Sequence, residues 1–289
     1  MISFKQFLSE KRSPTRPALW GVEAETALKA IKTNCSKAIK EAQEGRLLYR
    51  GVKGLDESYR AGDSALVMRK TGSQQFPHFH WLTNVLPSWK DYPSRNHAYI
   101  CSTSYSEAKR YADGGHVFVV FPYDNARIAI CPTHDMKNSF PELKSMKFNQ
   151  KNQTEDFNHA IGPVINAIVG KGNVGKSAEA IADQLKQIDF VALEKVILDA
   201  TVEKNYALKS AALKFHRMIK GYSNLFDALN DFMDPEMNGF ETHLMGDLPS
   251  DNREVWVVGK LVAKEIGVDD QQLKMLSDRL KIDHTLFHV

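Results

Sequence analysis

The chain has 289 residues, of which 43% are hydrophobic and 25% are charged, and these proportions are ordinary for a folded protein with a sizeable core. Its 38 Lys and Arg residues against 35 Asp and Glu residues leave a formal net charge of +3, which argues against a general nucleic-acid coat protein. Three cysteines are too few, and odd in number, for a disulfide framework, so we expect reduced, mostly buried thiols. No apolar run approaches the roughly 20 residues of a membrane-spanning helix. We expect no membrane contact.

Residues 1–20 are predicted to form an N-terminal extension. Pro14 and Pro17 end any helix that begins in the first ten residues, MISFKQFLSE. This stretch resembles the leader that directs internal head proteins of large tailed bacteriophages into the capsid, where a protease cuts after Leu-x-Glu. Leu8-Ser9-Glu10 fits that cut site. The resemblance implies a protein packaged in the virion and released into the host cytoplasm, and the alternative is a terminus that docks on the core.

The next segments alternate between helix and strand. Apolar residues at helical spacing predict a helix over Glu23–Glu44, which Gly45 ends. A strand over Arg46–Val52 follows, and then a stretch of loops and short elements from Lys53 to Pro93. Further strands are expected over Tyr99–Ser104 and His116–Pro122, with a short helix over Ser106–Ala112 between them. Ala126–Pro132 is expected to pair back with the preceding strand as a hairpin, through a turn at Asp124-Asn125.

From residue 154 onward, helical patterns dominate. The expected helices are Phe157–Val169, Ala178–Ile188, Val191–Thr201, Leu208–Lys220 and Leu225–Met233. Strand patterns return at Glu254–Val258 and Leu261–Lys264, and a helix over Asp269–Leu280 closes the chain. We therefore expect an α+β protein. Its mixed β core, with an N-terminal helix, occupies residues 21–153 and 241–289 and is interrupted by a helical insertion over residues 154–240.

Three short motifs fall at strand ends in a chemically suggestive order. They are Tyr49-Arg50-Gly51, Ser102-Thr103-Ser104 and the carboxylate Glu254. Cleavage of the bond between nicotinamide and ribose in NAD produces a sugar with oxocarbenium character, which a nearby carboxylate stabilises. A guanidinium matches the geometry of phosphate oxygens, and small hydroxyl residues can shape a pocket for the nicotinamide.

These motifs resemble the R-S-E signature of the arginine-motif mono-ADP-ribosyltransferases. The resemblance covers roughly residues 45–132 and 246–262. It implies the split β core of that family and NAD as a substrate, with no metal. It assigns the NAD phosphates to Arg50, with Tyr49 and Gly51 beside it, and the nicotinamide pocket to Ser102, Thr103 and Ser104. Glu254 is the implied catalytic carboxylate, with Arg50 and Ser102 completing the catalytic set.

The sequence departs from the family pattern at Asn252. In members that modify arginine, the residue two positions before the catalytic Glu is usually Glu, and in members that modify asparagine it is often Gln. Asn252 and Trp256 are expected to help select the acceptor, which the resemblance implies is a protein of a bacterial host. The residue type of the acceptor, a nucleic-acid contact and the oligomeric state stay open.

A rival motif lies within the predicted insertion. Gly170–Ser177 matches the P-loop pattern, and Asp199 lies at the end of a possible second strand. The spacing leaves too little room for a doubly wound sheet, so a nucleotide-hydrolysing protein is the second hypothesis and a non-catalytic internal virion protein the third. A metal site from His78, His80, Cys131 and His134 is not expected, because their spacing fits no zinc pattern.

Overall fold

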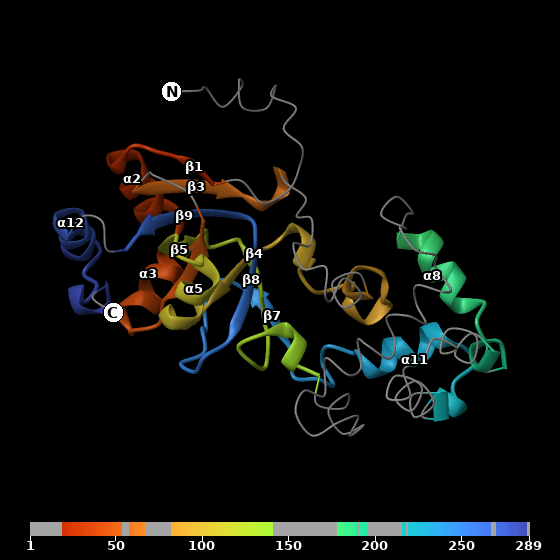
Figure 1. The fold of residues 1–289 in the computed structure, drawn as a ribbon. Helices are drawn as coiled ribbons and strands as arrows, with labels where there is room; N and C mark the ends of the chain where they lie inside the picture. Colours follow the sequence, from red (N-terminus) through yellow and green to blue (C-terminus); the bar gives the residue numbers. More distant parts are fainter. Residues whose placement is uncertain are drawn as a thin grey trace.

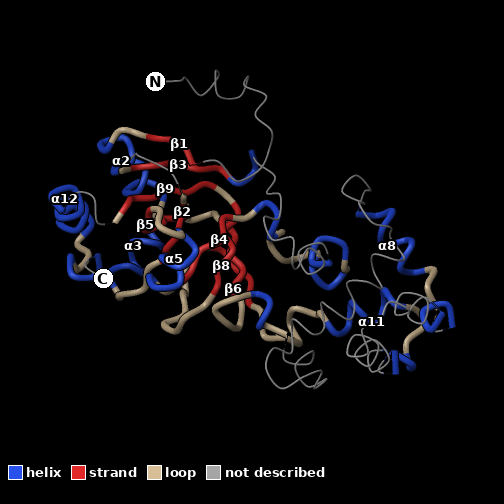
Figure 2. The backbone as a smooth tube through the Cα atoms, viewed as in Figure 1, coloured by secondary structure: helices blue, strands red, loops and turns tan. Residues whose placement is uncertain are grey.

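The structure is a computed structural model, and it describes residues 19–53, 58–66, 82–140, 178–189, 191–195, 216–217, 219–266 and 270–287. Figures 1 and 2 show a twisted β-sheet with helices packed around it, and α8 and α11 lie to one side of the sheet, opposite α12. The protein therefore belongs to the α+β class, as the sequence predicts.

In these ranges, nine strands form one sheet in the order β1-β3-β9-β5-β2-β4-β8-β6-β7, and every pair of neighbours is antiparallel. The strands are β1 (Leu19–Gly21), β2 (Leu48–Val52), β3 (Tyr59–Asp63), β4 (Tyr99–Ser102), β5 (His116–Pro122), β6 (Arg127–Ile130), β7 (Glu241–Leu244), β8 (Glu254–Val258) and β9 (Lys260–Glu265). The middle strand, β2, and its neighbours β5 and β4 come from the first half of the chain, and β8 and β9 from its end. The sheet therefore places distant segments of sequence side by side.

The pairing between neighbouring strands is shortest near the centre of the sheet, between β2 and β4. β2 pairs with β5 over all five of its residues, from Leu48↔Val120 to Val52↔His116. Its pairing with β4 consists of the single register pair Tyr49↔Ser102. We call this junction the seam, because it joins two well-paired halves of the sheet, β1-β3-β9-β5-β2 and β4-β8-β6-β7.

The helices in the described residues are mostly short. They are α2 (Ala24–Asn34), α3 (Ser36–Gln43), α5 (Tyr105–Ala112), α8 (Ala178–Lys186), α11 (Leu225–Phe232) and α12 (Asp270–Leu280). Six 3-10 turns accompany them: η1 (Ser64–Leu66), η2 (Pro87–Trp89), η3 (Arg95–His97), η4 (Met136–Asn138), η5 (Ile219–Gly221) and η6 (His284–Phe287). None of the helices described is long and apolar enough to cross a membrane.

The helix predicted over residues 23–44 is two helices, because the chain leaves helical geometry at Cys35, where φ is −121° and ψ is 37°. The turn after β5 docks at this break. The Asp124 carboxylate accepts bonds from the backbone of Lys37 (2.8 Å) and the hydroxyl of Ser36 (2.7 Å), and so satisfies donors at the start of α3. The Asp124 amide in turn donates to the Asn34 carbonyl. A tertiary contact thus divides a continuous apolar stripe.

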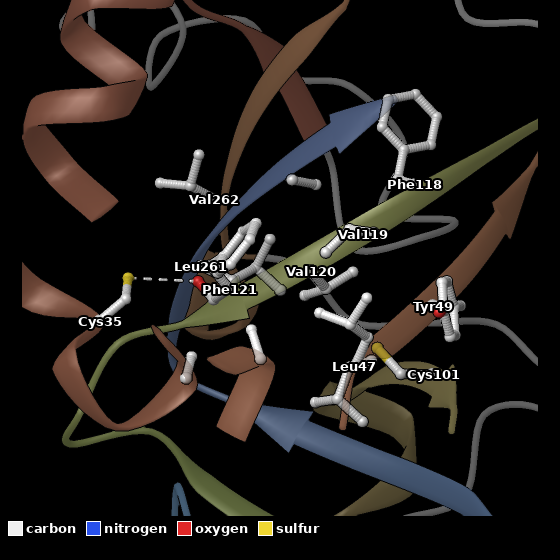
Figure 3. Packing of buried hydrophobic residues seen from close by; sticks show 14 of the residues in the cluster. Cys35, Leu47, Tyr49, Cys101, Phe118, Val119, Val120, Phe121, Leu261 and Val262 are labelled. Atoms are coloured by element: carbon white, nitrogen blue, oxygen red, sulfur yellow. Dashed lines mark hydrogen bonds between the residues drawn. The ribbon is translucent and has the colours of Figure 1, made fainter. Parts of the chain in front are cut away.

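Two apolar clusters hold the structure together. The first surrounds β2, β5 and β9, and Figure 3 shows residues of this cluster along the strands, including Phe121, whose carbonyl accepts from the Cys35 thiol. The second packs α8, α11 and the 82–98 segment against Trp256, Ala129 and Cys131 of the other half of the sheet. All three cysteines are buried and free, which confirms the prediction of unpaired thiols.

Helix α5 lies against β2 at a very short separation. A Cβ atom on Gly51 would stand 2.0 Å from the Ala108 carbonyl oxygen, so only glycine fits there. Tyr49, two residues earlier, meets the ring of Tyr105 on the same helix. Because side chains alternate along a strand, Tyr49 and Gly51 define the face of the sheet that α5 covers. We call it the α5 face.

Most predicted elements are confirmed. β2, β4, β5, β6, β8, β9, α5, α8, α11 and α12 lie where the sequence places them, within a few residues. Strands β1, β3 and β7 were not predicted. The hairpin expected between β5 and β6 is wrong, because β5 pairs with β2 and β9, and β6 with β8 and β7. The core is likewise antiparallel throughout the described strands rather than mixed.

Several predictions concern residues outside the described part of the chain. These are the leader, the helix over 157–169, the P-loop match at 170–177 with Asp199, and most of the helices over 191–201 and 208–220.

We expect Gly51→Ala to lower the free energy of unfolding by about 3 kcal/mol, because the added methyl group would collide with the backbone of α5. Chemical denaturation would measure the change. Gly221→Ala is the matched control, because nothing lies within 4 Å of the Cβ position there. A variant at Gly51 as stable as the control variant would contradict the packing described.

Candidate active site

The strand pairing aligns three of the predicted site residues in one row. Tyr49 on β2 is opposite Ser102 on β4, and Ser102 is opposite Glu254 on β8. Directly paired residues of antiparallel strands project from the same face of a sheet, so all three side chains point to the α5 face. Ser102 and Glu254 are therefore neighbours, although they are 152 residues apart in the chain.

Glu254 is buried, with 3% of its surface exposed, and its two oxygens have different surroundings. Oε1 accepts from the indole nitrogen of Trp256 at 2.6 Å and from Nε of Arg95 at 3.0 Å. Within the part of the chain that the structure describes, Oε2 accepts one hydrogen bond, from the backbone N–H of Met136 at a long 3.4 Å. The carboxylate is thus held firmly at one oxygen and loosely at the other.

The charge state of Glu254 follows from these contacts. Burial alone would raise its pKa, but the Arg95 guanidinium and the Trp256 and Met136 donors outweigh burial, and the net pKa is lowered. The carboxylate is therefore ionised at neutral pH inside a desolvated site. A buried carboxylate in this state can stabilise a developing positive charge.

Ser102, Thr103 and Ser104 form the bend from β4 into α5. The Ser102 hydroxyl accepts from the Ser104 amide at 3.0 Å, and Ser104 is the N-cap of α5, accepting from the Glu107 amide. The Thr103 hydroxyl donates to the Asp251 carbonyl at 2.6 Å, which ties this bend to the start of β8. The three residues therefore fix the entry to both α5 and β8.

Asn252 lies beside this bend. Its Oδ1 is 3.4 Å from the Ser102 hydroxyl, and 252 is an exposed position. It therefore sits at the surface next to the row of Tyr49, Ser102 and Glu254, where an incoming molecule can reach it. Trp256, by contrast, is fully buried, and its indole N–H donates to Glu254. The indole therefore has no exposed surface with which to contact an acceptor, as the sequence had predicted it would.

Arg50 does not point toward Glu254. It alternates with Tyr49 and Gly51 along β2, so its side chain leaves the opposite face of the sheet. There its guanidinium stacks over the Tyr99 ring at 5.5 Å and donates to the Ile100 carbonyl at 2.6 Å. Arg50 thus bridges β2 and β4 across the seam, where the two strands share only one register pair.

The guanidinium next to Glu254 is Arg95, which the sequence analysis did not single out. It lies in the turn η3, between the stretch predicted as loops (Lys53–Pro93) and the strand predicted from Tyr99, and its guanidinium also stands 5.8 Å from the centre of the Trp256 ring. Asp135 and Tyr111 lie nearby, and the Tyr111 hydroxyl donates to the Asp135 carboxylate at 3.2 Å. No spacing rule connects Arg95 to Glu254, because only the fold brings the two together.

Among the described residues, no group of three His, Cys, Asp or Glu side chains is placed to hold a metal ion. Cys131 and His134 lie within that part of the chain, whereas His78 and His80 do not. Burial raises the pKa of the Cys131 thiol well above its usual value, so this thiol stays protonated at neutral pH.

The lowered pKa of Glu254 makes a prediction about acid stability. An ionised, paired carboxylate stabilises the fold above its unfolded pKa of about 4.3, and this contribution is lost as the pH falls through the lower folded pKa. At pH 7 we expect Glu254→Gln to be less stable than the wild type by about 3 kcal/mol, since Arg95 loses its charged partner.

Denaturation curves from pH 7 to pH 3 would test this expectation. The difference in free energy of unfolding between the two proteins should shrink as the pH falls below the unfolded pKa of about 4.3, because the unfolded carboxyl then takes up protons more readily than the folded one. A difference that is the same at both ends of the range would contradict the assignment of an ionised Glu254.

Arg50 makes a separate prediction. Arg50→Gln should lower the free energy of unfolding by about 2 kcal/mol, because it removes the charged donor to the Ile100 carbonyl at the seam. Arg127→Gln is the control, since Arg127 is an exposed strand residue that also donates to a backbone carbonyl, that of Asp91. Equal stability of the two variants in urea denaturation would argue against a structural role of Arg50.

With this geometry in hand, we compared the chain with models of protein families, with curated proteins and with solved structures. None of the three comparisons returned a match.

Proposed function

We propose that the protein is a mono-ADP-ribosyltransferase, which transfers ADP-ribose from NAD to a protein acceptor and releases nicotinamide. The observation that carries the proposal is the pairing of Ser102 with Glu254 on one face of adjacent strands. This pairing unites two of the three motif members on which the resemblance depends. The proposal includes a core of the type found in that family, and the seam between β2 and β4 is consistent with a core made of two halves.

The chemistry requires a negative charge beside the ribose. When the bond from the ribose C1′ to nicotinamide breaks, its electron pair leaves with nicotinamide, and the sugar carries positive charge. Glu254, ionised and shielded from water, stabilises that charge. A nucleophile of the acceptor then bonds to C1′ and gives up its proton. The Ser102 hydroxyl lies next to Glu254 and is placed to order the same end of NAD.

Substrate access requires a local rearrangement. Glu254 is covered in this structure by Arg95 and by the backbone at Met136. The bond from Met136 is the longer of these, so we propose that NAD displaces the turn η4 rather than the ion pair. Arg50 has a supporting part in this scheme. It fixes β2 to β4 from the opposite face, and so sets the position of Ser102.

The acceptor side of the proposal depends on Asn252. It lies at the surface beside Ser102, so it is the motif residue nearest to an approaching protein. A bacterial host protein as acceptor, and travel of the enzyme inside a virion, remain predictions from the leader resemblance, because the leader lies outside the described residues.

Glu254→Gln is expected to reduce the release of nicotinamide from NAD by a factor of about 10³, because the amide cannot stabilise the sugar cation. Nicotinamide release from labelled NAD in the presence of a bacterial lysate, followed by mass mapping of the modified proteins, would measure both turnover and transfer.

The matched control is Glu241→Gln, which makes the same change at an exposed position at the start of β7 in the same sheet. This variant should retain wild-type turnover. Turnover that survives in Glu254→Gln, or its absence from the folded wild-type protein, would refute the proposed function.

A further inference from the structure

The carboxylate of Glu254 has two unequal oxygens, and this asymmetry carries an inference that rests on the proposed function. Two short hydrogen bonds, from the Trp256 indole and the Arg95 guanidinium, converge on Oε1. Oε2 has the 3.4 Å contact with the Met136 amide. A carboxylate accepts up to about four hydrogen bonds, so the loosely held oxygen is the one that can take a new partner.

We propose that Arg95 and Trp256 are positioning residues, which fix Oε1 of Glu254 so that Oε2 is the oxygen presented to the ribose of NAD. Arg95 reaches the carboxylate from the turn η3, and Trp256 from two positions further along β8. The two groups hold the side chain from different elements, so the carboxylate cannot rotate without breaking at least one short bond. Neither residue touches the substrate itself in this scheme.

The geometry of the supporting pair reinforces the inference. The Arg95 guanidinium also lies over the Trp256 ring in a cation–π contact, so the two donors stabilise each other's position as well as that of Glu254. Trp256 is itself held in an aromatic cluster, stacked on Trp89 with ring centres 5.8 Å apart. Supporting residues locked by packing are what keeps a catalytic group within a fraction of an ångström of its working position.

The other titratable groups around Glu254 come from every element packed against it. Within the described ranges they are Tyr111 on α5, Cys101 on β4, Cys131 and Asp135 in the segment after β6, and Arg253 beside it. Burial keeps the tyrosine and cysteines protonated near neutral pH. Arg95 is therefore the group whose removal should most change the ionisation of Glu254.

The test is the pH profile of nicotinamide release from NAD by the full chain, in the presence of the bacterial lysate that supplies the protein acceptor. In Arg95→Gln we expect kcat to fall by about tenfold or more, since a misplaced carboxylate loses catalytic efficiency steeply. The acidic limb of the profile should shift to higher pH, because Glu254 loses its cationic partner. The KM for NAD should change by less than about threefold, since Arg95 does not bind NAD in this scheme.

Two more variants make the test specific. Arg95→Lys, which keeps the charge, should restore the acidic limb and part of kcat. Trp256→Phe, which removes the indole donor, should lower kcat with a smaller shift of the limb. Arg279→Gln is the matched control, because Arg279 also pairs with a glutamate, Glu25, but at the exposed end of α12.

The inference is overturned if Arg95→Gln keeps the wild-type kcat and pH profile, or if its only effect is on KM. Loss of the proposed function would look different, because the wild-type protein itself would then release no nicotinamide. In that event a double-mutant cycle of Arg95→Gln with Glu254→Gln, measured by chemical denaturation, still tests whether Arg95 holds the Glu254 carboxylate. Coupling of less than about tenfold in the unfolding equilibrium constant at pH 7 would overturn it.

Discussion

The site depends on one buried ion pair. A carboxylate removed from water is stable as an anion only where donors replace its hydration, and Glu254 obtains those donors from Arg95 and Trp256. The sheet buries Glu254, the η3 turn brings the cation, and the aromatic cluster around Trp89 fixes the indole. If the carboxylate were neutral or absent, the Arg95 guanidinium and the Trp256 indole would lose the buried anion to which they donate.

The alternation of side chains along a strand decided which parts of the sequence motif meet. Ser102 and Glu254 project from one face because they are paired across β4 and β8, and the resemblance had assigned both residues to one site. Arg50 is next to Tyr49 in the same motif, yet a shift of one residue sends it to the other face. The sequence predicted that each of these residues lies at the end of a strand, but not which strands are neighbours or which side of β2 faces the site.

Arg95 was beyond the reach of sequence reasoning for a different reason. It lies in a stretch without helical or strand periodicity, and its partner is 159 residues away. The same limit applied to the fold. Strand β3, in the stretch predicted as loops, was not predicted because Arg60 and Gly62 interrupt its apolar pattern. The helix break at Cys35 depends on Asp124, which contacts the start of α3 from the turn after β5. Local propensity predicts elements well, whereas contacts between distant segments decide where they stop.

The attachment of the segment between β6 and β7 has an evolutionary consequence. The chain leaves the sheet at Ile130 and returns at Glu241, and these two residues are register partners on neighbouring strands. The register of β6 against β7 is therefore independent of the number of residues between these two positions, and lengthening a loop costs only about 0.6 kcal/mol for each doubling. Insertions away from η4, α8 and α11 can therefore be accepted while the strands that carry Ser102 and Glu254 keep their register.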